Sequence, residues 1–224
     1  LLSMQCKTGG LAAFDIDNDK NILNQVPFAD HGAMLDPPTA DVSGRVLWLL
    51  GRVGFKKNHP QVKRLIRFVK EKQESDGSWW GRWGVNYIYG SWLALTGLAS
   101  IGEDITQPYI RRTIKWYEDH QNEDGGWGET CESYKNPSLA GQGNSTASQT
   151  AWAVMGMIAG GEQKSLVIKR GVEFLLNRQE KYGSWHENEF TGTGFPMHFF
   201  IKYHMYQHLF PLMALGRYRS ALGS

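Results

Sequence analysis

The chain has 224 residues, of which 41% are hydrophobic and 21% are charged, and its formal net charge at pH 7 is +2. This balance is typical of a soluble globular protein with one substantial core, and it excludes a disordered or collagen-like chain. The basic residues are scattered along predicted helix faces without forming a concentrated stripe, so nucleic acid is not an expected partner.

The N-terminus and the apolar runs bear on cellular context. The sequence begins LLSMQCKTGG, without an initiating methionine or a signal sequence, so we expect it to come from inside a longer protein whose N-terminal part is absent. The longest apolar run, residues 151–160, is shorter than the roughly 20 residues that span a bilayer, so membrane contact is expected to be peripheral. Cys6 and Cys131 lack a CxxC spacing and fit a reduced, cytoplasmic compartment.

Three segments are predicted to form amphipathic helices. In the first, apolar side chains recur at Val62, Leu65, Ile66 and Val69, which is the spacing of one helix face, and Pro60 suits the first turn. The same pattern occurs twice more along the chain. The three predicted helices span residues 61–73, 108–121 and 165–179, and each ends at a glutamine.

Four further helical segments are richer in Ala, Leu, Trp and Met than in charged residues. They span residues 41–53, 90–101, 148–158 and 197–218. Helices of this composition are buried on more than one side. Alternation of an amphipathic helix with a more apolar one predicts two concentric layers, which is an all-α fold of the α/α toroid type or an arc of it.

A short motif is repeated at the helix ends. Four glutamines each precede a glycine-containing turn, and the residue six positions after the glutamine is Trp in three copies and Leu in the first. The pairs are Gln5 and Leu11, Gln73 and Trp79, Gln121 and Trp127, and Gln179 and Trp185. Because a motif that recurs four times is more suited to joining helices than to performing four reactions, we interpret these residues as structural.

The turns resemble the QW motifs of the triterpene cyclases, and the segments around them are similar to bacterial squalene-hopene cyclases. The likeness covers almost the whole chain and rests on AFDIDN (13–18), PFADHG (27–32), DPPTADV (36–42), GRWGVNYIYG (81–90), STASQTAW (145–152), TGTGFP (191–196) and HMYQHLFPLMALGRY (204–218). The resemblance implies that residues 1–224 form the C-terminal portion of the catalytic α/α barrel of a squalene-hopene cyclase-like protein.

The family resemblance also implies a reaction. Members of this family are isomerases that protonate a terminal alkene of squalene with an aspartic acid of a DxDD motif, and a carbocation cascade then yields a pentacyclic hopanoid without a cofactor. That motif is absent here, because the DIDN sequence at residues 15–18 matches a different stretch of the family. We therefore expect the acid upstream of Leu1, and we expect the fragment alone to be inactive.

Aromatic residues are the candidate catalytic groups, because ring faces stabilise a carbocation without trapping it. The resemblance points to Trp83, Tyr87, Phe195, Phe199, Tyr203 and Tyr206. The last four are spaced by four, four and three residues, which predicts one aromatic stripe on one face of the last helix.

Five other positions are expected at the site: Arg45 as a further catalytic residue, and Phe14, Phe28, Ala29 and Asp41 near the substrate. By resemblance, Phe28 and Ala29 match the channel constriction and inner cavity, and Phe14 stands where some relatives have Tyr. Asp41 and Arg45 are four apart on a predicted helix and could pair along one face. Some family members have a histidine at the second of these positions that supports the catalytic acid, whereas Arg45 is a permanent cation.

Two other functional classes stay open at this stage. A prenyltransferase β-subunit also forms an α/α toroid, but it needs an Asp/Cys/His zinc site, and the seven histidines show no accompanying metal-ligand spacing. A non-catalytic half toroid could instead bind lipids or a partner through its aromatic wall. The expected partners are a squalene-like polyprene, the absent N-terminal domain and the cytoplasmic face of a membrane, and homodimerisation is left open.

Overall fold

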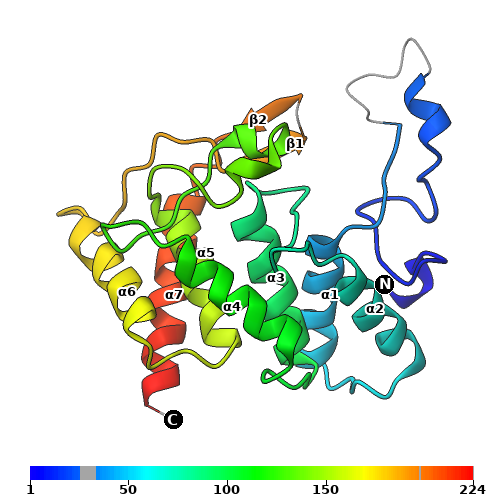
Figure 1. Ribbon diagram of the computed structural model, residues 1–224, viewed down its shortest axis with the longest axis horizontal. Helices are drawn as coiled ribbons and strands as arrows, with labels where there is room; N and C mark the ends of the chain where they lie inside the picture. The colour runs from blue at the N-terminus through cyan, green and yellow to red at the C-terminus, as the bar shows by residue number, and fades with distance from the viewer. Residues whose placement is uncertain (26–33, 197, 224) are drawn as a thin grey trace.

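The computed structural model describes residues 1–25, 34–196 and 198–223, and it is mostly helical (Figure 1). Its longer helices fall into an inner row and an outer row. The inner helices are α1 (Ala40–Arg52), α3 (Tyr87–Ser100), α5 (Ala147–Ala159) and α7 (Tyr206–Leu222), and the outer helices are α2 (Pro60–Glu71), α4 (Pro108–Asp119) and α6 (Leu166–Arg178). Within the inner row, α1 packs on α3, α3 on α5 and α5 on α7, while each outer helix packs on an inner neighbour. The predicted two-layer arc is confirmed.

The difference between the layers follows from their side chains. In α2 the apolar face is buried, including Val62, Leu65 and Val69, while Arg67 and Glu71 on the opposite face are exposed. In α3, by contrast, every residue from Tyr87 to Leu98 is buried. An amphipathic helix thus covers a helix that is apolar all round, as expected of an outer and an inner layer.

Small residues allow the two inner helices α1 and α3 to cross closely. A Cβ added to Gly97 of α3 would lie 2.3 Å from the carbonyl oxygen of Gly44 in α1, and a Cβ on Gly44 would lie 2.5 Å from the carbonyl oxygen of Leu93. Since no side chain fits at these distances, glycine at both positions is required for the backbones to approach.

The segment before the last helix differs from the expectation. The predicted helix over residues 197–218 is wrong in its first part, because α7 begins at Tyr206 and is preceded by an antiparallel hairpin of β1 (Gly192–Phe195) and β2 (Phe199–Ile201). Two glycines and Pro196 in TGTGFP disfavour helix, and the hairpin gains further pairing because the Val85 N–H donates to the Thr191 carbonyl.

Short 3₁₀ helices complete the described structure, at Leu2–Met4, Asn21–Gln25, Cys131–Tyr134 and Pro137–Leu139. None of the helices in the described part is both long and apolar enough to traverse a bilayer.

Candidate functional site

The repeated turns join the two helix layers through backbone hydrogen bonds. In all four turns the glutamine Nε2 donates to the carbonyl oxygen of the turn glycine over 2.8–3.0 Å. Each buried indole then donates from Nε1 to the preceding outer helix, with distances of 2.7 Å from Trp79 to Val69, 2.8 Å from Trp127 to Tyr117 and 2.8 Å from Trp185 to Leu175.

The same turns are tied to the inner helices by hydroxyl groups. The backbone N–H groups of Leu11, Trp79 and Trp127 donate to the side-chain oxygens of Ser43, Ser91 and Thr150, respectively, at 3.0, 2.9 and 2.9 Å. Leu11 therefore takes the structural place of a tryptophan, although it lacks the indole donor. The first turn has one fewer link to an outer helix as a result.

A buried carboxylate accepts backbone hydrogen bonds beside each of the four repeat turns. Only one of these four residues, Asp41, was among the predicted site residues. Asp36 accepts the N–H groups of residues 13–15, Glu129 accepts those of Asn86 and Ile88 at the start of α3, and Glu187 accepts the Ser148 N–H at the start of α5. Burial raises the pKa of Glu129 and of Glu187 above the usual carboxyl range, against the lowering effect of the hydrogen bonds they accept.

Asp41 is the fourth of these carboxylates and comes from α1 itself. Its side chain is 1% exposed, and both oxygens are engaged. Oδ1 accepts the Thr39 hydroxyl and the Val42 N–H, and Oδ2 accepts the N–H groups of Arg82 and Trp83 at 2.9 and 3.0 Å. The carboxylate therefore fixes the loop that carries Trp83 against the start of α1.

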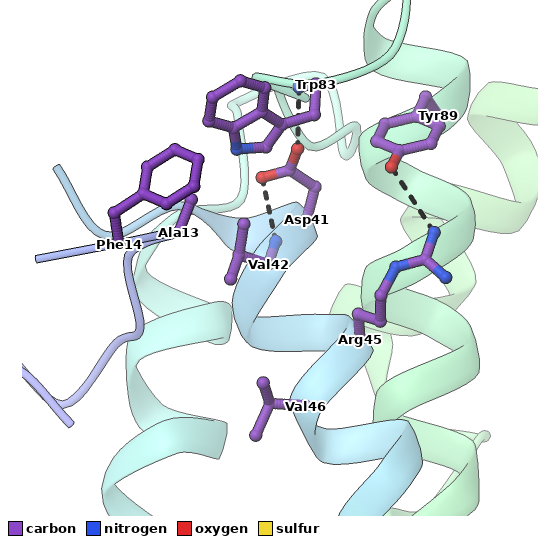
Figure 2. Close-up of a pocket in the computed structure, with 8 residues that line it drawn as sticks. All are labelled: Ala13, Phe14, Asp41, Val42, Arg45, Val46, Trp83 and Tyr89. Atoms are coloured by element: carbon purple, nitrogen blue, oxygen red, sulfur yellow. Dashed lines mark hydrogen bonds between the residues drawn. The ribbon is translucent and has the colours of Figure 1, made fainter. Parts of the chain in front are cut away.

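A cavity of about 320 Å³ lies beside the N-terminal half of α1 (Figure 2). Phe14 and Trp83 form part of its wall, with ring centroids 6.0 Å apart in an edge-to-face arrangement. Its lining residues are Ala13, Phe14, Asp41, Val42, Arg45, Val46, Trp83 and Tyr89. The lining is thus largely apolar and aromatic, with one carboxylate and one guanidinium.

The predicted pairing of Asp41 with Arg45 is wrong. Instead, Arg45 Nη2 donates to the Tyr89 hydroxyl at 3.5 Å (Figure 2). The guanidinium carbon also lies 5.8 Å from the Trp92 ring centroid. Asp41 is already satisfied by four donors, which are the Thr39 hydroxyl and the backbone N–H groups of Val42, Arg82 and Trp83. Burial raises the pKa of Tyr89, so its hydroxyl stays neutral.

Beyond Tyr89, an aromatic cluster connects α3, α5 and α7. Trp92 and Trp152 stack with centroids 6.0 Å apart, and Phe210 meets them edge-on at 5.4 and 5.3 Å. Tyr206 contacts Trp152 at 5.8 Å and Tyr203 at 4.6 Å, and burial raises its pKa. Of the residues predicted for the last helix, Tyr206 is the one that α7 contains.

The predicted aromatic stripe along one helix face is not formed. Phe195 and Phe199 lie on the two strands of the hairpin, with centroids 5.7 Å apart, and Tyr203 precedes α7. Tyr87 does not line the cavity either: its ring is buried at the start of α3, where burial and the nearby acids, Glu74 first, raise its pKa to about 12. Phe28 and Ala29 lie outside the described residues.

Sequence reasoning missed Tyr89, although it follows Trp83 within the same quoted motif. A signal was present for the buried glutamates, since Glu129 and Glu187 each stand two residues after a repeat tryptophan. Within the described residues, no group of three or more His, Cys, Asp or Glu side chains is arranged to hold a metal ion.

Two helix layers, indole-bearing turns and an aromatic-lined cavity define a terpene cyclase-like fold. The type II terpene cyclase MstE from Scytonema has a similar fold, with a TM-score of 0.67 over 98% of this chain and 66% of that one, at 18% identity. Sequence similarity identifies the family. The family model of the squalene-hopene cyclase C-terminal domain matches residues 1–220, so the chain belongs to this family.

Two relatives illustrate the range of the family. The chain is 52% identical over 219 residues to a squalene-hopene cyclase of Schizosaccharomyces japonicus, covering 98% of this chain and 33% of the relative. It is 46% identical over 243 residues to a dammaradiene synthase of Dryopteris crassirhizoma, covering 98% and 36%. The chain therefore spans about a third of the length of these relatives, and similarity to them does not fix one product type.

Proposed function

We propose that this chain forms one aromatic wall of the cavity in which a triterpene cyclase folds squalene, or a similar linear polyprene, and closes it to a pentacyclic hopanoid-type product. The observation that carries the proposal is the cavity beside α1, which is aromatic and apolar apart from Asp41 and Arg45. The acid that protonates the terminal alkene would come from polypeptide outside residues 1–224, since the sequence has no DxDD motif.

The lining suits a migrating positive charge. Phe14, Trp83 and Tyr89 present ring faces or edges to the cavity, and a desolvated ring can stabilise a nearby cation by about 2 kcal/mol. A free carboxylate or water would instead trap the cation by bond formation or deprotonation. Tyr206 and Phe210 extend the aromatic surface beyond Tyr89.

Asp41 is compatible with this chemistry because its lone pairs are occupied. Each oxygen accepts two hydrogen bonds, so the carboxylate acts as a positioning group for the Trp83 loop and is not available as a base. Arg45 would contribute differently. As a permanent cation at the cavity edge, it would lower the pKa of an acid placed opposite it, and it could not relay a proton.

The full-length protein is further proposed to bind the cytoplasmic face of a membrane peripherally, because its substrate partitions into bilayers. Exposed apolar side chains support this, with Ile16 48% and Ile22 69% exposed in one segment. Co-sedimentation of the full-length protein with phosphatidylcholine vesicles tests the idea. Equal recovery in the supernatant with and without vesicles would contradict it.

Product analysis tests the cyclase function. The full-length gene product is incubated with squalene, and products are identified by mass spectrometry for the wild type and for Phe14→Ala, Trp83→Ala and Phe190→Ala. Phe190→Ala is the matched control, because Phe190 is 52% exposed and does not line the cavity. Pentacyclic product is expected from the wild type and the control, with lower yield or incompletely cyclised product from the two cavity variants.

The remaining results would redirect the assignment. If the full-length protein makes no cyclic product from squalene or other polyprenes, the cyclase proposal fails and a lipid- or partner-binding role of the half toroid becomes the better account. If Phe14→Ala and Trp83→Ala produce the same products at the same rate as Phe190→Ala, the cavity beside α1 is not the reaction site.

A further inference from the structure

The inner helices carry an unbalanced positive charge. Four arginines lie on them, at Arg45, Arg52, Arg217 and Arg219, whereas α3 and α5 contain no charged residue. Asp41 is the one acidic residue of these four helices, and its oxygens already accept four hydrogen bonds. The positive charge is therefore not neutralised within the inner layer.

Three of these arginines gather around Trp48. Arg45, Trp48 and Arg52 are spaced by three and four residues, so they share one face of α1. Arg217 comes from α7, and its guanidinium carbon lies 5.4 Å from the centroid of the Trp48 ring. Burial lowers the pKa of Arg217, and the positive charges of Arg52 and Arg45 lower it further. The three guanidinium groups are therefore close enough to repel one another.

No carboxylate of the described residues relieves this repulsion. The ion pairs within residues 1–25, 34–196 and 198–223 involve other arginines and lysines. Arg45 has an uncharged acceptor, the Tyr89 hydroxyl. Arg52 lies in the last turn of α1, where the helix dipole favours a cation, but Arg45 and Arg217 are not in the last turn of their helices. The helix dipole thus accounts for one of the three arginines.

A groove of about 520 Å³ lies beside these arginines along α1. Trp48 and Leu49, the latter 43% exposed, give it an apolar wall. Its lining residues are Leu1, Arg45, Val46, Trp48, Leu49 and Arg52. Arg45 and Val46 also line the aromatic cavity (Figure 2), so the groove and the cavity adjoin on one face of α1. A hydrocarbon chain that leaves the cavity along α1 therefore reaches the arginines.

We propose that this groove binds the diphosphate group of a prenyl diphosphate, with the prenyl chain extending toward the aromatic cavity. Arginine presents paired N–H donors that match the geometry of phosphate oxygens, and a diphosphate can accept from more than one arginine at once. Trp48 and Leu49 would contact the first carbons of the chain. Such a ligand would exclude a squalene-like polyprene from the same end of the cavity, because Arg45 and Val46 line both sites.

The dimensions of the groove favour a compact anion with an apolar tail over an acidic protein segment. Arg45 and Arg52 are seven residues apart, which is about 10 Å along a helix. A diphosphate concentrates its charge at one end of this distance, beside Arg52 and Arg217, and leaves the apolar wall to the chain. An acidic segment would instead place carboxylates against Leu49 and Trp48, where an apolar wall offers them no hydrogen bond.

Direct binding to the full-length protein tests the site. Farnesyl diphosphate is titrated by calorimetry below its critical micelle concentration, beside inorganic diphosphate and farnesol as probes of the head group alone and the chain alone. The variants are Arg52→Ala and, as the matched control, Arg219→Ala. Both remove an exposed arginine of an inner helix, but Arg219 does not line the groove and does not contribute to the lowered pKa of Arg217. No squalene is present, so the outcome does not depend on cyclase activity.

Farnesyl diphosphate is expected to bind the wild type and Arg219→Ala equally. It should bind Arg52→Ala about tenfold more weakly, the factor expected for loss of one charge-assisted hydrogen bond. Inorganic diphosphate and farnesol should each bind at least about tenfold more weakly than the intact ligand, because each lacks one of its two contacts with the groove. Added salt should weaken binding, because the arginines are partly open to solvent.

Three results would overturn the proposal. Absence of binding would mean that the arginines are covered or neutralised by polypeptide outside residues 1–224. Equal binding by Arg52→Ala and Arg219→Ala, with thermal unfolding showing both variants folded, would place the ligand elsewhere. Equal affinity for farnesol would assign binding to the apolar cavity alone, and equal affinity for inorganic diphosphate would leave a simple anion site without a chain-binding wall.

Discussion

The three glutamines Gln73, Gln121 and Gln179 should contribute unequally to stability, although they occupy equivalent places in the repeat. The two Nε2 hydrogens of Gln73 have three acceptors within reach, at Gly77, Tyr109 and Thr113, and its Oε1 accepts from Arg112, so Gln73 makes three full hydrogen bonds at a time. Gln121 donates two, and Gln179 donates one from an exposed position. Substitution of each by alanine therefore removes different numbers of otherwise identical interactions.

The expected losses can be graded from these counts. At about 1 kcal/mol for each hydrogen bond, the free energy of unfolding should fall by roughly 3 kcal/mol in Gln73→Ala, by roughly 2 kcal/mol in Gln121→Ala and by less than about 1 kcal/mol in Gln179→Ala. For a chain of this size, about 1 kcal/mol corresponds to a shift in Tm of roughly 2–4 °C. The predicted differences are thus several degrees.

Urea unfolding followed by tryptophan fluorescence measures the effect, because three repeat indoles are buried beside the substituted residues. Gln179→Ala is the matched control for the other two, since it deletes the same atoms from the same kind of turn. Equal destabilisation by all three substitutions would refute the reasoning, because the bonds within the turn would then account for the whole effect.

Three further predictions concern other parts of the chain. Gly97→Ala should lower the free energy of unfolding by about 1–3 kcal/mol, because a methyl group there overpacks α1 against α3. Gly216→Ala, which has open space around it in α7, should raise the free energy of unfolding by up to about 1 kcal/mol. Equal effects of the two substitutions in thermal unfolding would contradict the close approach of α1 and α3. Asp41→Asn should lose about 1–3 kcal/mol for each backbone N–H left unpaired, and unchanged urea unfolding would contradict the role of both oxygens. Folding raises the pKa of Glu129, so the contribution of this residue to stability is greatest at low pH and is lost as pH rises through the folded-state pKa. Glu129→Gln should therefore become more stable relative to wild type as pH increases above the ordinary carboxyl pKa. A stability difference that does not change with pH would contradict this.

Apolar spacing and first-turn residues were sufficient to predict the amphipathic helices. The apolar spacing of α2 and the proline at its first position predicted its extent to within two residues at either end. The spacing argument failed for residues 195–206, because an i, i+4 pattern of aromatics is also satisfied by a hairpin followed by a helix start. Two glycines and a proline in TGTGFP were the stronger local signal there.

The site was predictable only in part. Trp83, Phe14, Asp41 and Arg45 all line the cavity beside α1, but the expected ion pair between Asp41 and Arg45 does not form. Spacing on a helix shows which side chains can meet, and it does not show which other donors compete. Asp41 accepts hydrogen bonds from the backbone of a loop about forty residues later in the chain, and no local sequence pattern predicts these bonds.

The repeat, the alternation of amphipathic and apolar helices and the family could all be predicted from the sequence, because each of these depends on residue type and spacing along the chain. Which repeat turns bond to a following outer helix depends instead on the folded chain. Gln121 and Gln179 begin turns with the same Gln, Gly and Trp spacing, yet within the described residues only Gln121 bonds the start of a following outer helix. Their difference lies in what packs against the turn, and packing partners are fixed by the fold as a whole.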